Sequence, residues 1–349
     1  MKLPSLLFLL LPLACPAQII QGNVQNGTSG APAAGSLVLL YNSSGEQGRA
    51  ITRSDGSFQI NGAAAPVHGS HGILEVIQDG VEYFQPVRPG QPANVKVYNA
   101  ASQVRAISSQ LSVLQFESKG DRLQVTELHA FNNASNPPIT KVSQNNLVVS
   151  LPQESRVQPA TVSGPDGGTT RIPLVRIADG RIADGSDQYR VEFPIKPGVT
   201  KYALSYDIPY DGSIVFRREA QYAIKRLNVI VPESMRFRPM GSEAFHEVGA
   251  GAREREQVLD DIGVNEHFAF ELSGTGGLVH SFHPSTPVER SASAAGVRMV
   301  VPDPPAATAL GANAAARHPL GIPVLLAFCI VAAAWVLLRR TIFKRQAQI

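Results

Sequence analysis

Two pairs of histidines in this chain have a spacing that suits metal binding. His68 is followed by His71, and His280 by His283, so each pair could offer two imidazoles to a divalent ion. A carboxylate from Glu75 could join the first pair. Stable zinc sites generally need three or four ligands. His68 and His71 therefore stand as candidate metal ligands, against the alternative of a polar, glycine-rich loop, and we expect no bound metal or cofactor.

Tyrosines gather in the second half of the sequence and could stack against sugar rings. Tyr202, Tyr206 and Tyr210 are the candidate ligand-binding residues, with Tyr222 as a fourth ring. Aromatic side chains on one face of a strand more often belong to a hydrophobic core. Only the exposure of these rings separates the two interpretations.

A tandem repeat of RIADG at 176–180 and 181–185 places two aspartates close together. Calcium-binding loops carry their acidic ligands at alternating positions, and these aspartates do not. The repeat is interpreted as a local duplication in a loop or hairpin.

Sequence patterns of common hydrolases and nucleotide-binding proteins are absent. There is no HExxH, HxxE or GxSxG, and no phosphate-binding GxxxxGK[ST]. The glycine-rich stretch 274–277 has no lysine after it and is expected to form a turn at a strand end. The two cysteines, Cys15 and Cys329, lie in the apolar terminal segments, which leaves the region between them without a thiol nucleophile or a disulfide. We therefore expect a protein that is not an enzyme.

Residues 320–338 form an uncharged run of nineteen residues that Arg339, Arg340, Lys344 and Arg345 follow at once. As a helix this run would be about 28 Å long, close to the ~30 Å hydrocarbon core of a bilayer. We predict a transmembrane helix in contact with the lipid bilayer. The cations place the tail, 339–349, in the cytoplasm by the positive-inside rule, so the domains before the helix are extracytoplasmic.

The N-terminal residues 1–17 resemble a signal peptide, with Lys2 before an apolar stretch and Ala17 at the expected cleavage site. The alternatives are a lipidated Cys15 and an uncleaved anchor, and the apolar stretch is short for a span. Both ends of the chain therefore indicate a single-pass membrane protein of the cell envelope.

The charge balance argues against a nucleic-acid partner. The chain has 31 Lys and Arg against 28 Asp and Glu. Lys2 and the four cations of the tail account for the excess, so residues 18–319 hold 26 cations and 28 anions. No basic face is implied.

Residues 18–100 read as short strands separated by turns. The four turn signals are Asn26-Gly27, Ser44-Gly45, Asp55-Gly56 and Asp79-Gly80. Such dipeptides accept positive φ readily and favour tight hairpins. The seven predicted strands lie at 19–24, 36–41, 50–52, 57–60, 73–78, 81–84 and 95–98.

This region carries a family resemblance. Gly22-x-Val24-x-Asn26-Gly27-Thr28, Pro32-Ala33 and Thr52-x-Ser54-Asp55-Gly56-Ser57-Phe58-x-Ile60 resemble the carboxypeptidase regulatory-like domain, which has a transthyretin-like sandwich fold. The resemblance covers about 80 residues of the chain. It implies a non-catalytic module of exported bacterial proteins, with some relatives grouped among starch-binding-like folds. The zinc-peptidase motif that the family name suggests is missing.

Residues 104–280 form a second β-rich region. Between 201 and 208 one alternating set is apolar or aromatic and the other is mainly polar, as expected for a strand with one buried face. The first set is Tyr202, Leu204, Tyr206 and Ile208, and the second is Lys201, Ala203, Ser205 and Asp207. A short surface helix is predicted at 252–262, and a flexible stalk rich in Ala, Pro and Ser at 281–319. The predicted strands lie at 104–115, 123–131, 147–151, 188–194, 200–208, 213–222, 227–231 and 267–272.

The sequence therefore predicts an all-β protein with two tandem β-sandwich domains plus one C-terminal transmembrane helix. Its predicted function is a non-enzymatic protein–protein or cell-surface interaction, with an envelope protein or a polysaccharide as partner. The alternatives are a carbohydrate-binding surface module and a hydrolase with an unrecognised site in residues 104–280.

Overall fold

A computed structural model describes residues 18–63, 72–88, 90–181, 185–241, 244–248 and 253–278. These residues contain strands, turns and bends and no helix, so the predicted all-β class is confirmed for them. Within this part of the chain no helix is long and apolar enough to cross a membrane. The predicted signal peptide, stalk, membrane span and tail lie outside the described residues.

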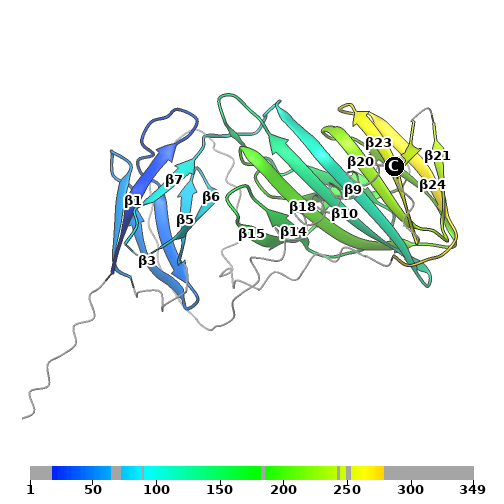
Figure 1. Cartoon of the computed structure of the whole chain (residues 1–349), viewed down its shortest axis with the longest axis horizontal. Helices are drawn as coiled ribbons and strands as arrows, with labels where there is room; N and C mark the ends of the chain where they lie inside the picture. Colours follow the sequence, from blue (N-terminus) through cyan, green and yellow to red (C-terminus); the bar gives the residue numbers. More distant parts are fainter. Residues whose placement is uncertain are drawn as a thin grey trace, which may run out of the picture. The chain divides into compact units, whose positions relative to one another are not determined.

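The chain divides into two compact units, which are coloured blue to cyan and cyan to yellow in Figure 1. The first consists of the residues up to Gln25 together with Ala31–Ile77 and Glu82–Val97. The second contains the rest, including the short segments Asn26–Gly30 and Gln78–Val81.

Seven strands form the two sheets of the first unit; six were predicted from the sequence within a few residues, and β3 is longer than the predicted 50–52 and begins at Gly45. One sheet has the order β4-β1-β7 and the other β3-β2-β5-β6. Alternate residues of β4, β5 and β7 are buried, as expected for strands with one face on a core. The strands are β1 (Gln18–Asn26), β2 (Leu37–Asn42), β3 (Gly45–Ile51), β4 (Ser57–Ala63), β5 (Gly72–Gln78), β6 (Val81–Val87) and β7 (Ala93–Val97).

Two of the four predicted hairpins are confirmed. Ser44-Gly45 joins β2 to β3 and Asp79-Gly80 joins β5 to β6, and both pairs are neighbours in a sheet. The hairpin predictions at Asn26-Gly27 and Asp55-Gly56 are wrong, because those turns lead from one sheet to the other. At the latter turn, Gly56 has φ 78° and the Asp55 carboxylate accepts a hydrogen bond from the Ser57 backbone N–H.

Gly22 lies in the middle of β1, where β7 approaches very closely. A Cβ atom at this position would lie 1.9 Å from the carbonyl oxygen of Ala93 and 2.7 Å from its carbonyl carbon. Both are backbone atoms, which cannot move aside as the end of a long side chain can. Only glycine therefore fits between these two strands.

The largest sheet belongs to the second unit and has nine strands. Their order is β15-β14-β18-β10-β9-β20-β23-β22, with β13 paired to β18 beside β14. The central strands lie side by side in Figure 1. The strands are β9 (Ile107–Lys119), β10 (Arg122–Asn133), β13 (Arg156–Val157), β14 (Ala160–Ser163), β15 (Thr169–Ile172), β18 (Gly198–Pro209), β20 (Ala223–Pro232), β22 (His246–Glu247) and β23 (Glu254–Ile262).

A layer of two separate three-stranded sheets packs on one face of this nine-stranded sheet. The orders are β12-β17-β16 and β19-β24-β21, and a short parallel pair, β8 with β11, lies apart from both. Buried side chains from the nine-stranded sheet and from both three-stranded sheets form one hydrophobic core. The strands are β8 (Ala100–Ala101), β11 (Thr140–Lys141), β12 (Leu147–Leu151), β16 (Val175–Arg181), β17 (Asp187–Val191), β19 (Ser213–Glu219), β21 (Arg236–Met240) and β24 (His267–Ser273).

The predicted helix at 252–262 is wrong. Residues Glu254–Ile262 form β23, which pairs with β20 along its length and with the short β22 on its other side. Leu259 and Ile262 belong to the core of the second unit. The tertiary pairing with an apolar neighbour therefore decides the conformation of this charged segment.

The first RIADG copy lies in β16, which pairs antiparallel with β17. The second copy begins at the end of β16 and leads toward β17, and residues 182–184 of it are outside the described part. This arrangement agrees with the predicted hairpin.

Three hydrogen-bonding contacts hold the chain where it leaves β24. Tyr210 Oη donates to the carbonyl oxygen of Gly274 at 2.6 Å. Ser234 Oγ donates to the carbonyl of Thr275 at 2.7 Å. Ser118 and Gly276 exchange bonds: the backbone N–H of Ser118 donates to the Gly276 carbonyl, and the Gly276 N–H donates to Ser118 Oγ. Residues 274–276 are therefore attached to the end of β9 and to the loops that follow β18 and β20.

Candidate functional site

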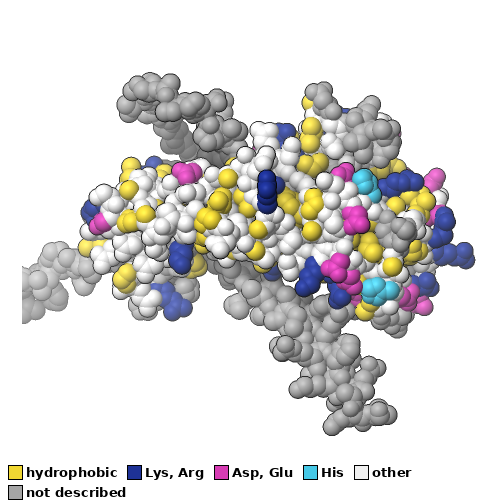
Figure 2. Space-filling view, turned by 90° about the horizontal axis from the view of Figure 1, so that it is seen from above, with side chains coloured by type: hydrophobic (Ala, Val, Ile, Leu, Met, Phe, Trp, Pro, Cys, Tyr) yellow, Lys and Arg dark blue, Asp and Glu magenta, His cyan; other side chains and the backbone are white. Residues whose placement is uncertain are grey.

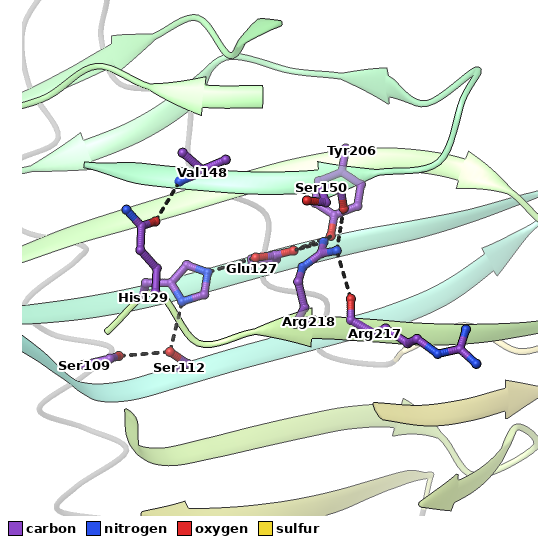
Figure 3. A network of polar contacts seen from close by, with 10 residues as sticks. Ser109, Ser112, Glu127, His129, Val148, Ser150, Tyr206, Arg217 and Arg218 are labelled. Atoms are coloured by element: carbon purple, nitrogen blue, oxygen red, sulfur yellow. Dashed lines mark hydrogen bonds and ion pairs between the residues drawn. The ribbon is translucent and has the colours of Figure 1, made fainter. Parts of the chain in front are cut away.

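A network of buried polar side chains lies inside the second unit. We call it the Glu127 cluster, and Figure 3 shows Glu127 between His129 and Arg218. Its members come from β9, β10 and β18 of the large sheet and from β19 of the facing layer. They are Ser109, Ser112, Glu127, His129, Tyr206 and Arg218.

Alternation along β10 directs two of these residues inward. Leu123, Val125 and Phe131 face the core, and Glu127 and His129 occupy the positions between them in the same alternation. The carboxylate of Glu127 is thus placed in an apolar interior, where a charge is costly unless it is paired.

A bulge in β9 brings two serines to the same inner face. Ser112 pairs with His129, and Ser109 pairs with Phe131, so Gln110 is the extra residue. In a regular strand, residues three positions apart point to opposite faces. The bulge removes that difference, and the hydroxyls of Ser109 and Ser112 lie 2.9 Å apart.

Glu127 receives three polar partners. One carboxylate oxygen contacts Arg218 Nη2 at 3.0 Å and accepts a hydrogen bond from Tyr206 Oη, while the other lies 2.9 Å from His129 Nε2. Burial raises the pKa of Glu127, but the Arg218 charge and the bonds from His129 and Tyr206 outweigh it and lower the pKa to about 2. Glu127 is therefore ionised at neutral pH.

Arg218 connects the cluster to the facing layer. Its Nη2 also donates to Tyr206 Oη at 2.9 Å, and its Nη1 donates to the backbone carbonyl of Ser150 in β12. The guanidinium lies over the Phe216 ring, 4.4 Å from the ring centroid. One side chain thus links β19 with β12, β10 and β18.

The order Ser112, His129, Glu127 has the connectivity of a nucleophile, a base and an orienting carboxylate. Ser112 Oγ lies 2.9 Å from His129 Nδ1, and His129 Nε2 lies 2.9 Å from Glu127. In hydrolases this connectivity allows the imidazole to remove the serine proton during attack on an acyl carbon.

Access distinguishes this cluster from a catalytic triad. Ser112 is 1% exposed and points between the layers, where its hydroxyl is also bonded to Ser109. Attack on an acyl group requires the substrate carbon within about 3–3.5 Å of the hydroxyl oxygen. A substrate could reach Ser112 only if the layers separated. The geometry therefore describes an internal network that joins the two layers, and we call the contacts of Glu127 with Arg218, Tyr206 and His129 the clamp.

The exposure of the tyrosines separates the two interpretations made from the sequence. Tyr202, Tyr206 and Tyr210 are core residues, so their assignment as candidate ligand-binding residues is corrected. Tyr202 is 1%, Tyr206 0% and Tyr210 6% exposed. Their hydroxyls bond internally: Tyr202 to the Phe193 carbonyl, Tyr206 to Glu127 and Tyr210 to the carbonyls of Gly212 and Gly274. These rings cannot stack on a ligand at the surface.

The candidate metal ligands His68 and His71 lie outside the described residues, and so do His280 and His283. Glu75 is located in β5. Among the residues that the structure describes, no three or more His, Cys, Asp or Glu side chains gather closely enough to hold a metal ion.

The clamp predicts acid sensitivity of the second unit. The pKa of Glu127 is lower in the folded protein, about 2, than its ordinary value of 4.5, so the stabilisation is complete above pH 4.5 and is lost as the pH falls toward 2. The free energy of unfolding, measured by urea titration from pH 6 to 2.5, should therefore decrease more steeply in the wild type than in Glu127→Gln. Equal slopes in the two proteins would contradict the assignment.

No protein-family model matches the sequence, and no curated protein matches it. Solved structures with partial likeness include a putative protease from Parabacteroides distasonis, with 11% identity and a TM-score of 0.34 over 49% of this chain and 41% of the other. An M1 zinc metallopeptidase from Deinococcus radiodurans has 14% identity and a TM-score of 0.30 over 48% and 42%. Yeast LTA4 hydrolase has 4% identity and a TM-score of 0.34 over 48% and 29%. The chain spans less than half the length of each of these three structures, and likenesses this distant assign no activity to it.

Proposed function

We propose that this chain is a non-enzymatic, membrane-anchored extracytoplasmic protein whose two tandem β-sandwich domains act in protein–protein interaction. The membrane part of the proposal rests on the sequence: a signal peptide at 1–17, a stalk at 281–319, a transmembrane helix at 320–338 and a cytoplasmic tail at 339–349. For the first domain we propose a carboxypeptidase regulatory-like fold, supported by its seven strands in two sheets.

The observation that carries the interaction proposal is a row of aliphatic side chains on the outer face of the nine-stranded sheet. Leu128 is opposite Val113 on one side and Ala203 on the other, and Ala130 is opposite Leu111. None of them belongs to the core between the layers: Leu111 is exposed, Val113, Leu128 and Ala130 are half-buried, and Ala203 is 6% exposed. We call Leu111, Val113, Leu128, Ala130 and Ala203 the aliphatic stripe.

The stripe reaches solvent at one end. Leu111 is 37% exposed, and Val199, which is opposite Asn132 at the next outward position along β10, is 38% exposed. Contiguous apolar side chains on the outside of a sheet are typical of surfaces that bind another protein.

The chemistry of this face favours a protein partner over a sugar. Sugar-binding surfaces use aromatic rings for stacking, and the outward positions of β9, β10 and β18 carry no aromatic residue. Aliphatic side chains instead complement an apolar patch on another polypeptide.

One charged residue, Lys201, is opposite Ala130 on the same outer face of the sheet. Figure 2 shows Lys, Arg, Asp and Glu gathered toward the end that carries β21–β24, with both signs intermixed. Ion pairs between Arg238 and Glu271 and between Arg226 and Asp260 belong to this end. We therefore do not propose that a large electrostatic field of one sign steers the partner to this face.

Position-specific photo-crosslinking in the native membrane tests the proposal. A photoreactive residue in place of Leu111 or Val113 should give an adduct that protease removes, because the partner is a protein. The same residue in place of Arg238, which is exposed on β21, should give none. Leu128→Lys should abolish the adduct at Leu111. Adducts of equal yield at all positions, or adducts that only a glycosidase removes, would contradict the proposal.

A further inference from the structure

In the layer opposite the nine-stranded sheet, β12 and the C-terminal end of β19 with the residues after it, 218–222, contact each other without strand pairing, and we call this contact the joint. β12 pairs only with β17, and β19 pairs only with β24. Within the described residues, no backbone–backbone hydrogen bond connects residues 145–151 with 213–222. A continuous layer would have a ladder of such bonds at this place.

Side chains replace the missing ladder. Gln221 Oε1 accepts from the backbone N–H of Val148 at 3.0 Å, and Gln221 Nε2 donates to the carbonyl of Asn145 at 2.6 Å. Tyr222 Oη donates to the carbonyl of Asn146 at 2.8 Å, and Arg218 Nη1 donates to the carbonyl of Ser150. Figure 3 shows the contacts of Val148 and Ser150. All these contacts run from side chains of 218–222 to the backbone of 145–150.

The direction of the backbone groups shows that β12 offers an edge to this joint. In an antiparallel strand, the N–H and C=O of one residue point to the same side, and the next residue points to the other. Because Val148 N–H and Ser150 C=O point toward the joint, the N–H groups of Leu147, Val149 and Leu151 point toward β17. Neighbouring backbone N–H groups of β12 therefore have different partners: that of Val148 bonds a side chain across the joint, and those of Leu147, Val149 and Leu151 point toward the backbone of β17.

Among the side chains that cross the joint, Arg218 is the one that also forms an ion pair with Glu127 in the large sheet. Its Nη1 lies 3.5 Å from the carbonyl of Arg217 in its own strand as well as contacting Ser150 across the joint. Gln221, by comparison, makes its two contacts only across the joint and lies at the half-buried surface.

We infer that the joint is the place where the facing layer opens. The sheets β12-β17-β16 and β19-β24-β21 separate there, and neither sheet unfolds. Separation occurs when the side chains of Arg218, Gln221 and Tyr222 release the backbone of 145–150. Opening exposes the outer backbone edge of β12. This inference is independent of the aliphatic stripe, which lies on the other face of the large sheet.

Hydrogen exchange at single residues of the full chain, resolved by fragmentation of the exchanged peptides, tests the inference. In the wild type, the Val148 amide should exchange faster than the Val149 amide and with little dependence on urea, because it needs only the local opening. In Gln221→Ala, exchange at Val148 should become about fivefold faster or more, as expected for the loss of one hydrogen bond, with Val149 unchanged.

Gln110→Ala is the matched control, because the Gln110 amide bonds only Ser108 Oγ on an exposed part of β9. It should leave both amides as in the wild type. Equal exchange rates and equal urea dependence at Val148 and Val149 would overturn the inference, since both amides would then require global unfolding. A Gln221→Ala variant that accelerates the two amides equally would overturn it as well.

Discussion

Replacement of Arg218 by methionine should lower the free energy of unfolding of the second unit by about 3–5 kcal/mol, the usual cost of removing one partner of a buried ion pair. The physical reason is that Glu127, only 2% exposed, would keep a charge with no cationic partner from β19. The Tyr206 hydroxyl would also lose the hydrogen bond that it accepts from Arg218 Nη2. Urea titration followed by far-ultraviolet circular dichroism gives the free energy.

A double variant separates the ion pair from simple loss of packing. Glu127→Leu with Arg218→Met removes both charges, so it should be more stable than Arg218→Met alone. If the two substitutions add, or if Arg218→Met costs less than about 1 kcal/mol, the clamp does not depend on the pairing of Glu127 with Arg218.

Replacement of Gly22 by alanine should destabilise the first unit by about 2–3 kcal/mol or more, at the upper end of the cost of overpacking. The added methyl group would lie 1.9 Å from the Ala93 carbonyl oxygen, so β1 and β7 would have to move apart. Hydrogen exchange of the amides in β1 and β2, measured with increasing urea, reports the free energy of opening of this unit.

Gly35→Ala provides the control for this position. Gly35 has φ 77° and nothing within 4 Å of its added Cβ, so the substitution tests backbone strain without a collision. It should cost about 1–2 kcal/mol, the penalty of the left-handed region. A Gly22→Ala protein that is as stable as Gly35→Ala would show that β7 can move away at little cost.

Alternation of apolar and polar residues was sufficient to locate most of the long strands. β10, β12, β18 and β24 were predicted within a few residues, because each has one face on the core. β23 was missed because its sequence is dominated by charges that face solvent or pair with β20 and β22. β14 and β15 are four residues each, too short for a periodic pattern to be distinguished.

The Glu127 cluster could not be predicted, since its members come from four strands whose pairing is set by the whole sheet. A local signal existed: Glu127 and His129 continue the inward alternation of Leu123 and Val125. A charged residue in such a position indicates a buried partner, but sequence alone does not identify Arg218, which is 91 residues away. The position of Ser109 beside Ser112 depends in addition on a bulge that no residue pattern announced.

The attachment of β24 determines how the second unit responds to mechanical force. β24 pairs on both edges, with β19 and with β21, and leads directly into the held residues 274–276. The hydrogen bonds of an antiparallel ladder are perpendicular to the strands. A pull on residue 278 along β24 would therefore load both ladders in shear, with all bonds sharing the tension, rather than peel them apart one after another. Because forced unfolding follows the unfolding rate rather than the equilibrium stability, this geometry gives the second unit resistance to traction from its C-terminal side.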